Sequence, residues 1–409
     1  MKYVIIGNSA AGVGCIEGIR QVDREGEITV ISNEPYHTYS RPLISYLLYG
    51  KTDEQKMKYR PDDFYEKNNV NFIYGNVTKI DSTAKTVEYE TSILVYDKLL
   101  VATGSRAFVP PFAGLDGVAE RYTFMSLNDA KALEQAISQD KRVLIVGAGL
   151  IGLKCAEGIA ARVKSVTVAD LADRILPSIL DEQGAGIVQR HIESKGIKFK
   201  LSANITRFEG NTAILDGGDA IDFDILVLAV GVRPNTALLG GIADIDKGII
   251  VNEKSETSAE NIYAAGDCTQ TIDASSGKSK IMALLPNAYM QGEIAGLNMA
   301  GFTSTLKPRF IPMNAIGFFG LHIITAGGCQ LTIDNGQLTI NKSDNYRRFF
   351  VDNGVLRGYI LIGNVEKAGI YTSLIREQIP LVHIDFELLK EKPGLMAFSR
   401  EDRAKKLTI

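Results

Sequence analysis

Two glycine-rich turns, each lying between an apolar strand pattern and a helix pattern, constrain the fold of this chain more than any other feature of its sequence. The first is Gly7-Asn-Ser-Ala-Ala-Gly12, after the apolar run Tyr3 to Ile6, and the second is Gly147-Ala-Gly-Leu-Ile-Gly152, after Val143 to Val146. A helix that begins directly after such a turn directs its free backbone amides at one spot, where a pyrophosphate can bind. The sequence therefore predicts an α/β chain with two nucleotide-binding units.

A carboxylate follows each turn at the end of the next predicted strand. Glu34 follows the strand Ile28 to Ser32, and Asp170 follows the strand Ser165 to Val168. An acid at this place, about 20 residues after the turn, accepts hydrogen bonds from the hydroxyls of a ribose and repels a 2'-phosphate. Asp170 therefore predicts a preference for NADH over NADPH. The first turn departs from the usual pattern, because Ser9 replaces the middle glycine.

Composition excludes several other classes of protein. The net charge of -3 gives no broad attraction for nucleic acid. No apolar run approaches the roughly 20 residues that span a bilayer, and the N-terminus lacks the layout of a secretory signal, so we expect a cytoplasmic protein. The 4 cysteines, Cys15, Cys155, Cys268 and Cys329, form no CxxC pair, and the 4 histidines show no metal-ligand spacing. We therefore expect neither a local redox disulfide nor a metal site.

An ordered set of segments identifies a family resemblance over residues 1 to about 300. The chain resembles the FAD-dependent pyridine nucleotide oxidoreductases of the glutathione-reductase superfamily, and within it the ferredoxin reductase, rubredoxin reductase and nitrite-reductase-like flavoprotein branch. The matching segments are Gly7 to Gly12, Leu100-Val-Ala-Thr-Gly-Ser105, Gly147 to Gly152, Ala229-Val-Gly-Val-Arg-Pro-Asn235, and Thr257 through Ile262-Tyr-Ala-Ala-Gly-Asp267. The disulfide-reductase branches place redox cysteines near Tyr39 to Tyr46, whereas this chain has no cysteine between Cys15 and Cys155.

The resemblance implies a fold of two Rossmann-like, three-layer ββα nucleotide-binding domains followed by a small α+β domain. The NAD-binding domain, residues 109–235, is expected to be inserted into an FAD-binding domain made of residues 1–108 and 236–306. Residues 307–409 are expected to form the C-terminal domain, which serves as an interface or docks a partner. Its pattern changes from about Phe310 to strands around Ile323, Leu338, Phe349 and Leu361, then a helix from Lys367 to Arg376. We expect the apolar segment Phe310 to Gly320 to pack on the flavin domain or at an interface.

The resemblance also implies roles for particular residues. Asp267 is expected to bind the flavin ribityl chain, Glu34 the ADP half of FAD, and the backbone of Val77 the adenine. Arg41 and Pro42 are expected beside the flavin, and the Thr103-Gly104 turn where the chain crosses between domains. The full set expected to bind FAD and NADH is Gly7, Ser9, Ala11, Gly12, Glu34, Arg41, Pro42, Val77, Ala102, Thr103, Gly104, Arg106, Gly147, Gly149, Leu150, Ile151, Gly152, Asp170, Gly231, Gly266 and Asp267.

Two positions depart from the family in a correlated way. After the second turn the family commonly reads GxExA, but this chain has Lys154 in place of the glutamate. Ferredoxin reductases pair that glutamate with a lysine after an RPxLS segment, where this chain has Tyr46. We expect Lys154 and Tyr46 to act as catalytic residues, in contact at the nicotinamide side of the flavin. The phenol would accept a hydrogen bond from the ammonium, and the lone positive charge would stabilise the reduced flavin. Neutral drift at two positions near a cleft is the alternative.

The expected activity is hydride transfer from NADH to bound FAD, without redox cysteines. Flavin N5 accepts hydride from nicotinamide C4, and the protein supplies positioning and field. The leading hypothesis is that electrons then leave to a protein acceptor, such as a rubredoxin, a ferredoxin or an iron-sulfur subunit. The alternatives are an NADH oxidase or quinone reductase, and a flavoprotein with an assembly or signalling role. The sequence leaves the oligomeric state open.

Overall fold

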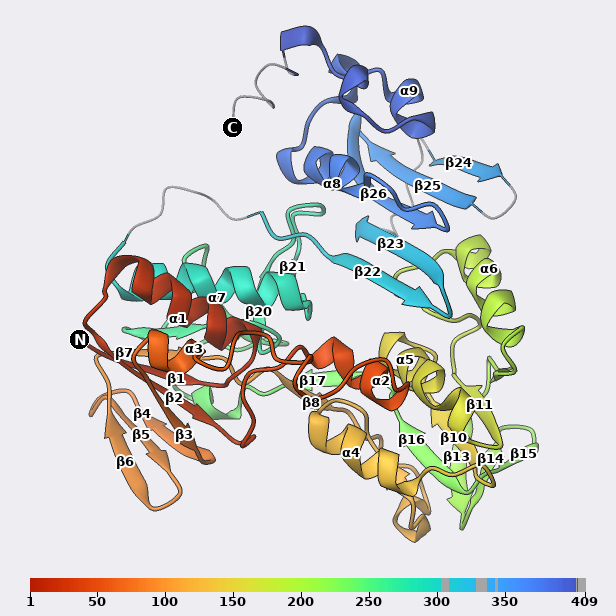
Figure 1. Ribbon diagram of the computed structural model, residues 1–409, viewed down its shortest axis with the longest axis horizontal. Helices are drawn as coiled ribbons and strands as arrows, with labels where there is room; N and C mark the ends of the chain where they lie inside the picture. The colour runs from red at the N-terminus through yellow and green to blue at the C-terminus, as the bar shows by residue number, and fades with distance from the viewer. Residues whose placement is uncertain (303–308, 329–336, 343–344, 402, 404–409) are drawn as a thin grey trace.

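The computed structural model describes residues 1–302, 309–328, 337–342, 345–401 and 403. Its first unit is a parallel sheet of order β19-β7-β1-β2-β3 (Figure 1). The strands are β1 (Lys2–Ile6), β2 (Glu27–Ser32), β3 (Val70–Tyr74), β7 (Lys98–Val101) and β19 (Ile262–Ala264). Because side chains alternate along a strand, Tyr3 and Ile5 pack with helix α1 (Ala10–Val22), while Val4 and Ile6 pack on the other face. That face is covered by an antiparallel meander of β4 (Val77–Asp81), β5 (Thr86–Tyr89) and β6 (Ser92–Val95).

Helix α1 lies against α7 (Leu285–Met299) through small residues (Figure 1). A Cβ atom added to Gly14 or Gly18 of α1 would lie 2.2 or 2.3 Å from a backbone oxygen of α7. The same addition at Gly292 or Gly296 of α7 would lie 2.0 or 2.2 Å from a backbone oxygen of α1. Both helices therefore depend on glycine for this close contact. The contact holds the start of α1, which directly follows the first glycine-rich turn.

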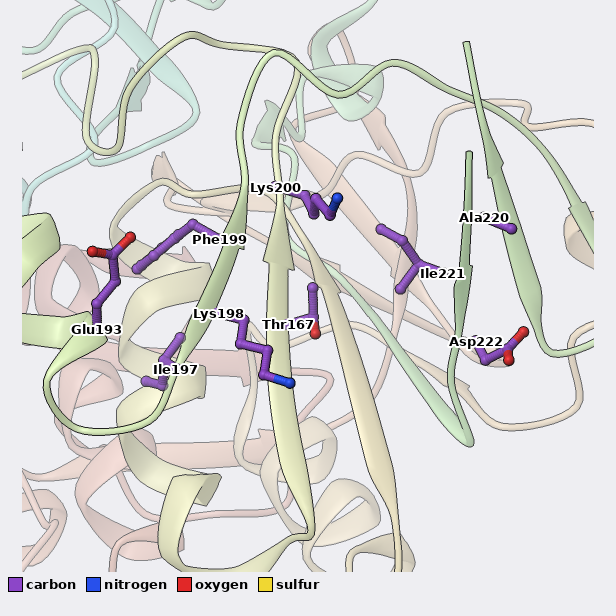
Figure 2. Close-up of a pocket in the computed structure, with 9 residues that line it drawn as sticks. All are labelled: Thr167, Glu193, Ile197, Lys198, Phe199, Lys200, Ala220, Ile221 and Asp222. Atoms are coloured by element: carbon purple, nitrogen blue, oxygen red, sulfur yellow. The ribbon is translucent and has the colours of Figure 1, made fainter. Parts of the chain in front are cut away.

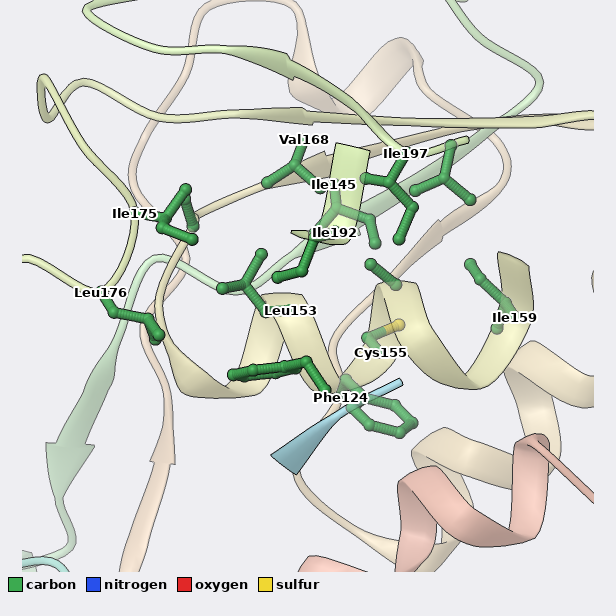
Figure 3. Close-up of a cluster of buried hydrophobic side chains, with 14 of the residues drawn as sticks. Phe124, Ile145, Leu153, Cys155, Ile159, Val168, Ile175, Leu176, Ile192 and Ile197 are labelled. Carbon is green, nitrogen blue, oxygen red and sulfur yellow. The ribbon is translucent and has the colours of Figure 1, made fainter. Parts of the chain in front are cut away.

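The second unit repeats the three layers within the stretch between β7 and β19. Its parallel sheet has the order β12-β11-β10-β16-β9. The strands are β9 (Arg121–Tyr122), β10 (Arg142–Val146), β11 (Ser165–Ala169), β12 (Lys198–Lys200) and β16 (Ile225–Leu228). Helices α4 (Leu127–Ala136), α5 (Leu150–Ile159) and α6 (Glu182–Glu193) accompany it, with a meander of β13 (Ile205–Glu209), β14 (Thr212–Leu215) and β15 (Ala220–Asp222). The helix side of the core includes Ile145, Leu153 and Val168 (Figure 3). The second unit is therefore inserted into the first. We call it the NAD-type unit, because the sequence predicts that NADH binds there.

Short elements connect these two units. Strands β8 (Ser105–Ala107) and β17 (Val232–Pro234) form an antiparallel ribbon where the chain leaves and re-enters the first unit. Between β2 and β3 lie η1 (Arg41–Leu43), α2 (Ile44–Leu48) and α3 (Phe64–Lys67). A three-stranded sheet follows β17, made of β18 (Ile249–Ile250), β20 (Thr269–Ile272) and β21 (Ser279–Lys280). The domain boundaries given above stay predictions.

The last part of the chain is an antiparallel sheet of order β22-β23-β26-β25-β24, with helices α8 (Ala368–Glu377) and α9 (Phe386–Glu391). The strands are β22 (Met313–Phe318), β23 (Leu321–Gly327), β24 (Gln337–Lys342), β25 (Asn345–Asp352) and β26 (Val355–Ile362). Phe318 and Phe350 belong to the core of the NAD-type unit, whereas Phe349 packs with the side of α8. No helix among the described residues is long and apolar enough to cross a membrane.

The segment Phe310 to Gly320 contacts both nucleotide-binding units. At its start, the carbonyl oxygen of Phe310 accepts a hydrogen bond from the backbone of Ala274, and Asn287 of α7 donates to the carbonyl of Ile311. At its end, Phe318 is fully buried in the core of the NAD-type unit. The segment is therefore an interface that joins all parts of the molecule.

Candidate active site

The first turn has the geometry of a pyrophosphate cradle. Gly7 has a φ of +116°, and a Cβ atom there would lie 2.1 Å from the carbonyl oxygen of Ala102, so only glycine fits. Ser9, in place of the middle glycine, is the N-cap of α1 in an extended conformation (φ −119°), which any residue adopts, and its side chain makes no cap hydrogen bond. The first amides of α1 therefore stay available to an anion. The FAD pyrophosphate fits here.

Glu34 lies just beyond β2, at the carboxyl edge of the first sheet. The Tyr39 hydroxyl donates to Glu34 Oε1 (2.9 Å), and Arg41 forms an ion pair with Glu34 Oε2. The backbone N–H of Leu127, at the start of α4, donates to the same Tyr39 hydroxyl (3.0 Å). The acid expected to bind the FAD ribose is therefore oriented by two residues of the following loop. Sequence reasoning named Arg41 but missed Tyr39.

The crossing between units brings Thr103, Asn235 and Asp267 close together. The Thr103 hydroxyl donates to the carbonyl of Asn235 (2.6 Å), and the Asn235 amide donates to the carbonyl of Thr103 (2.9 Å). Ser105 lies two residues after Thr103, and its hydroxyl donates to Asp267 Oδ2 (3.4 Å). Burial raises the pKa of Asp267, an effect that Ser105 and Arg41 oppose. Among the described residues, no cation forms an ion pair with this half-buried carboxylate, which fits a partner rich in hydroxyls, such as a ribityl chain.

Asp267 has its backbone held by a residue that the sequence did not single out. Gln291 of α7 accepts from the backbone N–H of Gly266 (2.7 Å) and from the hydroxyl of Thr269 (3.0 Å). Gly266 has a φ of +83°. Gln291 thus fixes the turn between β19 and β20 that carries Asp267.

The second turn repeats the first with an acid in direct contact. Gly147 has a φ of +117°, and α5 begins at Leu150 with Gly149 as its N-cap. Asp170 accepts from the backbone N–H of Ala148 (2.5 Å) and of Ala172 (2.7 Å). The carboxylate therefore lies beside the turn that holds the pyrophosphate, where it can reach an adenosine ribose.

Lys154 and Tyr46 are brought together, and their contact joins the two units. The Lys154 ammonium lies 4.5 Å from the centroid of the Tyr46 ring and 5.6 Å from that of Phe318. The contact is with the face of the ring, a cation–π interaction, where we had expected a hydrogen bond to the hydroxyl. The ammonium also donates to the carbonyl of Gly317 (3.2 Å). Lys154 is therefore turned inward, with 17% of its side chain exposed.

The expectation of a lone positive charge was wrong, because Lys154 forms an ion pair with Glu157. Glu157 is one turn further along α5, and its other oxygen accepts from the backbone N–H of Phe319 (2.6 Å). The pair is nearly neutral as a unit and is held by the turn between β22 and β23. The spacing of three residues on a helix was a signal that could have identified Glu157.

The other predicted positions lie around these centres. Ala11 and Gly12 are in the first turn of α1, Leu150, Ile151 and Gly152 begin α5, and Ala102 directly follows β7. Pro42 is in η1, Val77 begins β4, Arg106 is in β8, and Gly104 and Gly231 flank the ribbon. A hollow of about 640 Å³ between β12 and β15 is lined by Thr167, Lys198, Lys200 and Asp222, among others, and by none of these positions (Figure 2).

The cysteines that the structure describes are buried thiols. Cys15, Cys155 and Cys268 are free and buried, and Cys155 points into the apolar core (Figure 3). Burial raises the pKa of Cys268 to about 11 and raises the pKa of Cys15 and Cys155 further. Thiols of this kind are poor nucleophiles at neutral pH. Cys329 lies outside the described residues.

Comparison with known proteins shows the family to which the chain belongs. A family model described as pyridine nucleotide-disulphide oxidoreductase matches residues 1–292, and one described as rubredoxin NAD+ reductase C-terminal domain matches residues 312–379. The chain is 30% identical over 393 residues to the NADH-dependent phenylglyoxylate dehydrogenase subunit epsilon of Aromatoleum evansii, covering 93% of this chain and 92% of that protein. It is 33% identical over 358 residues to an NADH oxidase of Methanocaldococcus jannaschii (83% and 78%), and 30% identical over 319 residues to a rubredoxin-NAD(+) reductase of Pseudomonas putida (75% and 82%).

The fold is also found among solved structures. The reductase in the covalent putidaredoxin reductase–putidaredoxin complex superposes with a TM-score of 0.87 at 21% identity, covering 96% of each chain. The two glycine turns thus lie on a fold shared with putidaredoxin reductase. The chain belongs to the pyridine nucleotide-disulphide oxidoreductase family and is a flavoprotein oxidoreductase that uses FAD and NADH.

Proposed function

We propose that this protein is an NADH:acceptor oxidoreductase whose electrons leave to a protein partner, a rubredoxin, a ferredoxin or an iron-sulfur subunit. When bound, the flavin supplies the chemistry, taking hydride from the nicotinamide at N5. The chain's own residues bind and orient the two nucleotides. Gly7, α1 and Glu34 form one site, and Gly147, α5 and Asp170 form the other.

The observation that carries this proposal is the Lys154–Tyr46 contact between the two nucleotide units. This contact lies where α2 and α5 pack against each other, and α2, which carries Tyr46, contains no cysteine. A reduced flavin at this place would have no dithiol in α2 to reduce, which supports an acceptor outside the chain. The names of the relatives, a rubredoxin-NAD(+) reductase and a subunit of an NADH-dependent dehydrogenase, agree with a protein acceptor.

The experiment is a sequence of three measurements on the purified chain. It should retain FAD, its flavin should bleach when NADH is added without air, and rubredoxin or ferredoxin should then be reduced at a rate far above the background. A folded chain that retains no flavin would contradict the cofactor assignment. A flavin that NADH reduces, but that reduces neither protein nor an iron-sulfur subunit from the native source, would contradict the acceptor.

A cysteine-free variant tests whether thiols take part. Replacing Cys15, Cys155, Cys268 and Cys329 by alanine or serine should leave flavin reduction by NADH largely intact, apart from losses of stability at the buried positions. Loss of hydride transfer in a folded, FAD-loaded variant would reveal a redox thiol.

A second candidate function is an NADH oxidase, because the relative from Methanocaldococcus jannaschii carries that name. Rapid oxygen consumption with NADH and no added protein would favour it. Slow flavin reduction by NADH under all conditions would instead favour an assembly role. We place the protein in the cytoplasm, and a fractionation of the native cells tests this.

A further inference from the structure

Two arginines lie directly opposite each other on the ribbon that joins the nucleotide units. In the antiparallel pair of β8 and β17, Arg106 is the partner of Arg233. Cross-strand neighbours point to the same face, with Cβ atoms about 5 Å apart, and like charges in this position destabilise the pair. Two arginines here need a compensating negative charge.

No described carboxylate supplies that charge. Arg106 donates to the side-chain oxygen of Asn235 (3.0 Å), and the Arg233 guanidinium lies 4.4 Å from the centroid of the Phe108 ring. A hollow of about 580 Å³ is lined by both arginines and by Lys247, which comes from the loop before β18. The nearest acid in sequence, Asp246, accepts from the side chain of Gln270 instead. Within the described chain, the three cations form no ion pair.

The hollow lies on the outer face of the ribbon. Successive side chains of a strand point to opposite faces, and Ser105 is the residue that contacts Asp267. Arg106, which the sequence predicted to bind a cofactor, therefore points away from the carboxylate expected to bind the flavin ribityl chain.

We propose that this hollow docks the acidic surface of the electron-acceptor protein, an inference that rests on the proposed function. Arg106, Arg233 and Lys247 are all exposed, whereas pockets for small ligands bury most of their occupant. Between them lie Phe108, Pro234 and Val109, the last 44% exposed. An apolar centre within a charged rim is typical of transient protein interfaces, and electron-transfer complexes are among the smallest of them. A cluster of exposed positive charges also speeds the association of an acidic partner by electrostatic steering.

The test uses a rubredoxin of net negative charge as the acceptor and two variants of equal charge. The first is Arg233→Gln with Lys247→Gln. The matched control is Arg24→Gln with Lys164→Gln, which removes one arginine and one lysine from exposed positions elsewhere. At low ionic strength the first variant should lower kcat/KM for rubredoxin by about tenfold and weaken direct binding by calorimetry. The control should change both much less, and added salt should remove most of the difference.

Flavin reduction by NADH, measured in a single turnover without rubredoxin, serves as the internal reference. It should be the same in both variants and in the wild type. Equal losses of kcat/KM in the two variants would overturn the docking site, since only net charge would then matter. Unchanged binding in the first variant would overturn it too. If the wild type reduces no protein acceptor at all, the proposed function fails instead.

Discussion

Lys154 is held by groups from three parts of the chain. Glu157 belongs to the same helix, the Tyr46 ring comes from α2, and the Gly317 carbonyl comes from β22. The side chain of Glu157 is only 10% exposed. Removing one member of a buried pair leaves the other charge uncompensated, which costs more than removing both. Loss of Lys154 would therefore leave an uncompensated negative charge on Glu157, at the place where we predict the flavin to bind.

Lys154→Met should slow flavin reduction by NADH by about tenfold, roughly 1.4 kcal/mol, and lower the flavin reduction potential. Combining Lys154→Met with Glu157→Gln should restore much of the reduction rate and of the reduction potential, because the double variant has no unpaired carboxylate. Tyr46→Phe should have a smaller effect, since it keeps the ring face under the ammonium. Stopped-flow absorbance and a redox titration measure these changes. A double variant as slow as Lys154→Met would show that the lysine acts directly on the reaction.

Asp170 should set the preference between the two nicotinamide cofactors. NADH should have a higher kcat/KM than NADPH, because we expect the carboxylate to face the 2'-position of the ribose. Asp170→Ala should narrow the difference, mainly by raising KM for NADH. The control is Asp173→Ala, an exposed acid that pairs with Arg174. A wild type that favours NADPH would refute the assignment.

At the scale of elements, the contact between α1 and α7 positions the FAD cradle. Gly292 approaches the backbone of Ala11, one residue before Gly12. A shift of α7 therefore moves the amides that would hold the pyrophosphate. Helix propensity alone disfavours glycine in both helices, so the close approach of the backbones explains why it is used.

Gly292→Ala should lower stability by about 1–3 kcal/mol, the usual cost of overpacking, and weaken FAD retention. Its new Cβ atom would lie 2.0 Å from the carbonyl oxygen of Ala11. The matched control is Gly369→Ala in α8, where nothing lies within 4 Å and alanine is the better helix former. Thermal unfolding and the fluorescence of released flavin measure both effects. Equal melting temperatures for the two variants would show that the helices can separate without cost.

At the scale of the whole molecule, the C-terminal sheet joins two cores. Phe318 belongs to the core of the NAD-type unit, and Phe349 to the core under α8. Arg348 and Tyr346, on β25, both bind Asp181, the N-cap of α6. The turn after β22 also holds Glu157. Loss of packing on one face of the sheet should therefore affect a different part of the molecule from loss on the other.

Phe318→Ala and Phe349→Ala test this division, since both side chains are fully buried. Each should cost about 3–5 kcal/mol. Hydrogen exchange should increase in α5 and α6 for Phe318→Ala, and in α8 and α9 for Phe349→Ala. Only Phe318→Ala should also slow flavin reduction, because it releases the backbone beside Lys154. Identical exchange patterns in the two variants would show a single core.

Sequence determined the local features of this protein. The turns at Gly7 and Gly147 and the acids Glu34 and Asp170 follow from steric and electrostatic rules that act over a few residues. The pairing of Lys154 with Tyr46 followed from comparing two positions with a family pattern, and the structure brings them together. The roles of these residues with bound FAD and NADH stay predictions.

Tertiary structure alone decided the contacts between distant segments. The ion pair of Lys154 with Glu157 is local, but the orientation of the Glu157 carboxylate depends on a hydrogen bond from the backbone of Phe319, which is far away in sequence. The opposition of Arg106 and Arg233 depends on the register of two strands far apart in sequence. Hydrophobic patterning specifies which face of an element is buried, whereas register and the packing partner depend on the whole chain. Composition could therefore not show that a chain of net charge -3 carries a basic hollow on the ribbon between its two units, whose cations form no ion pair with any described residue.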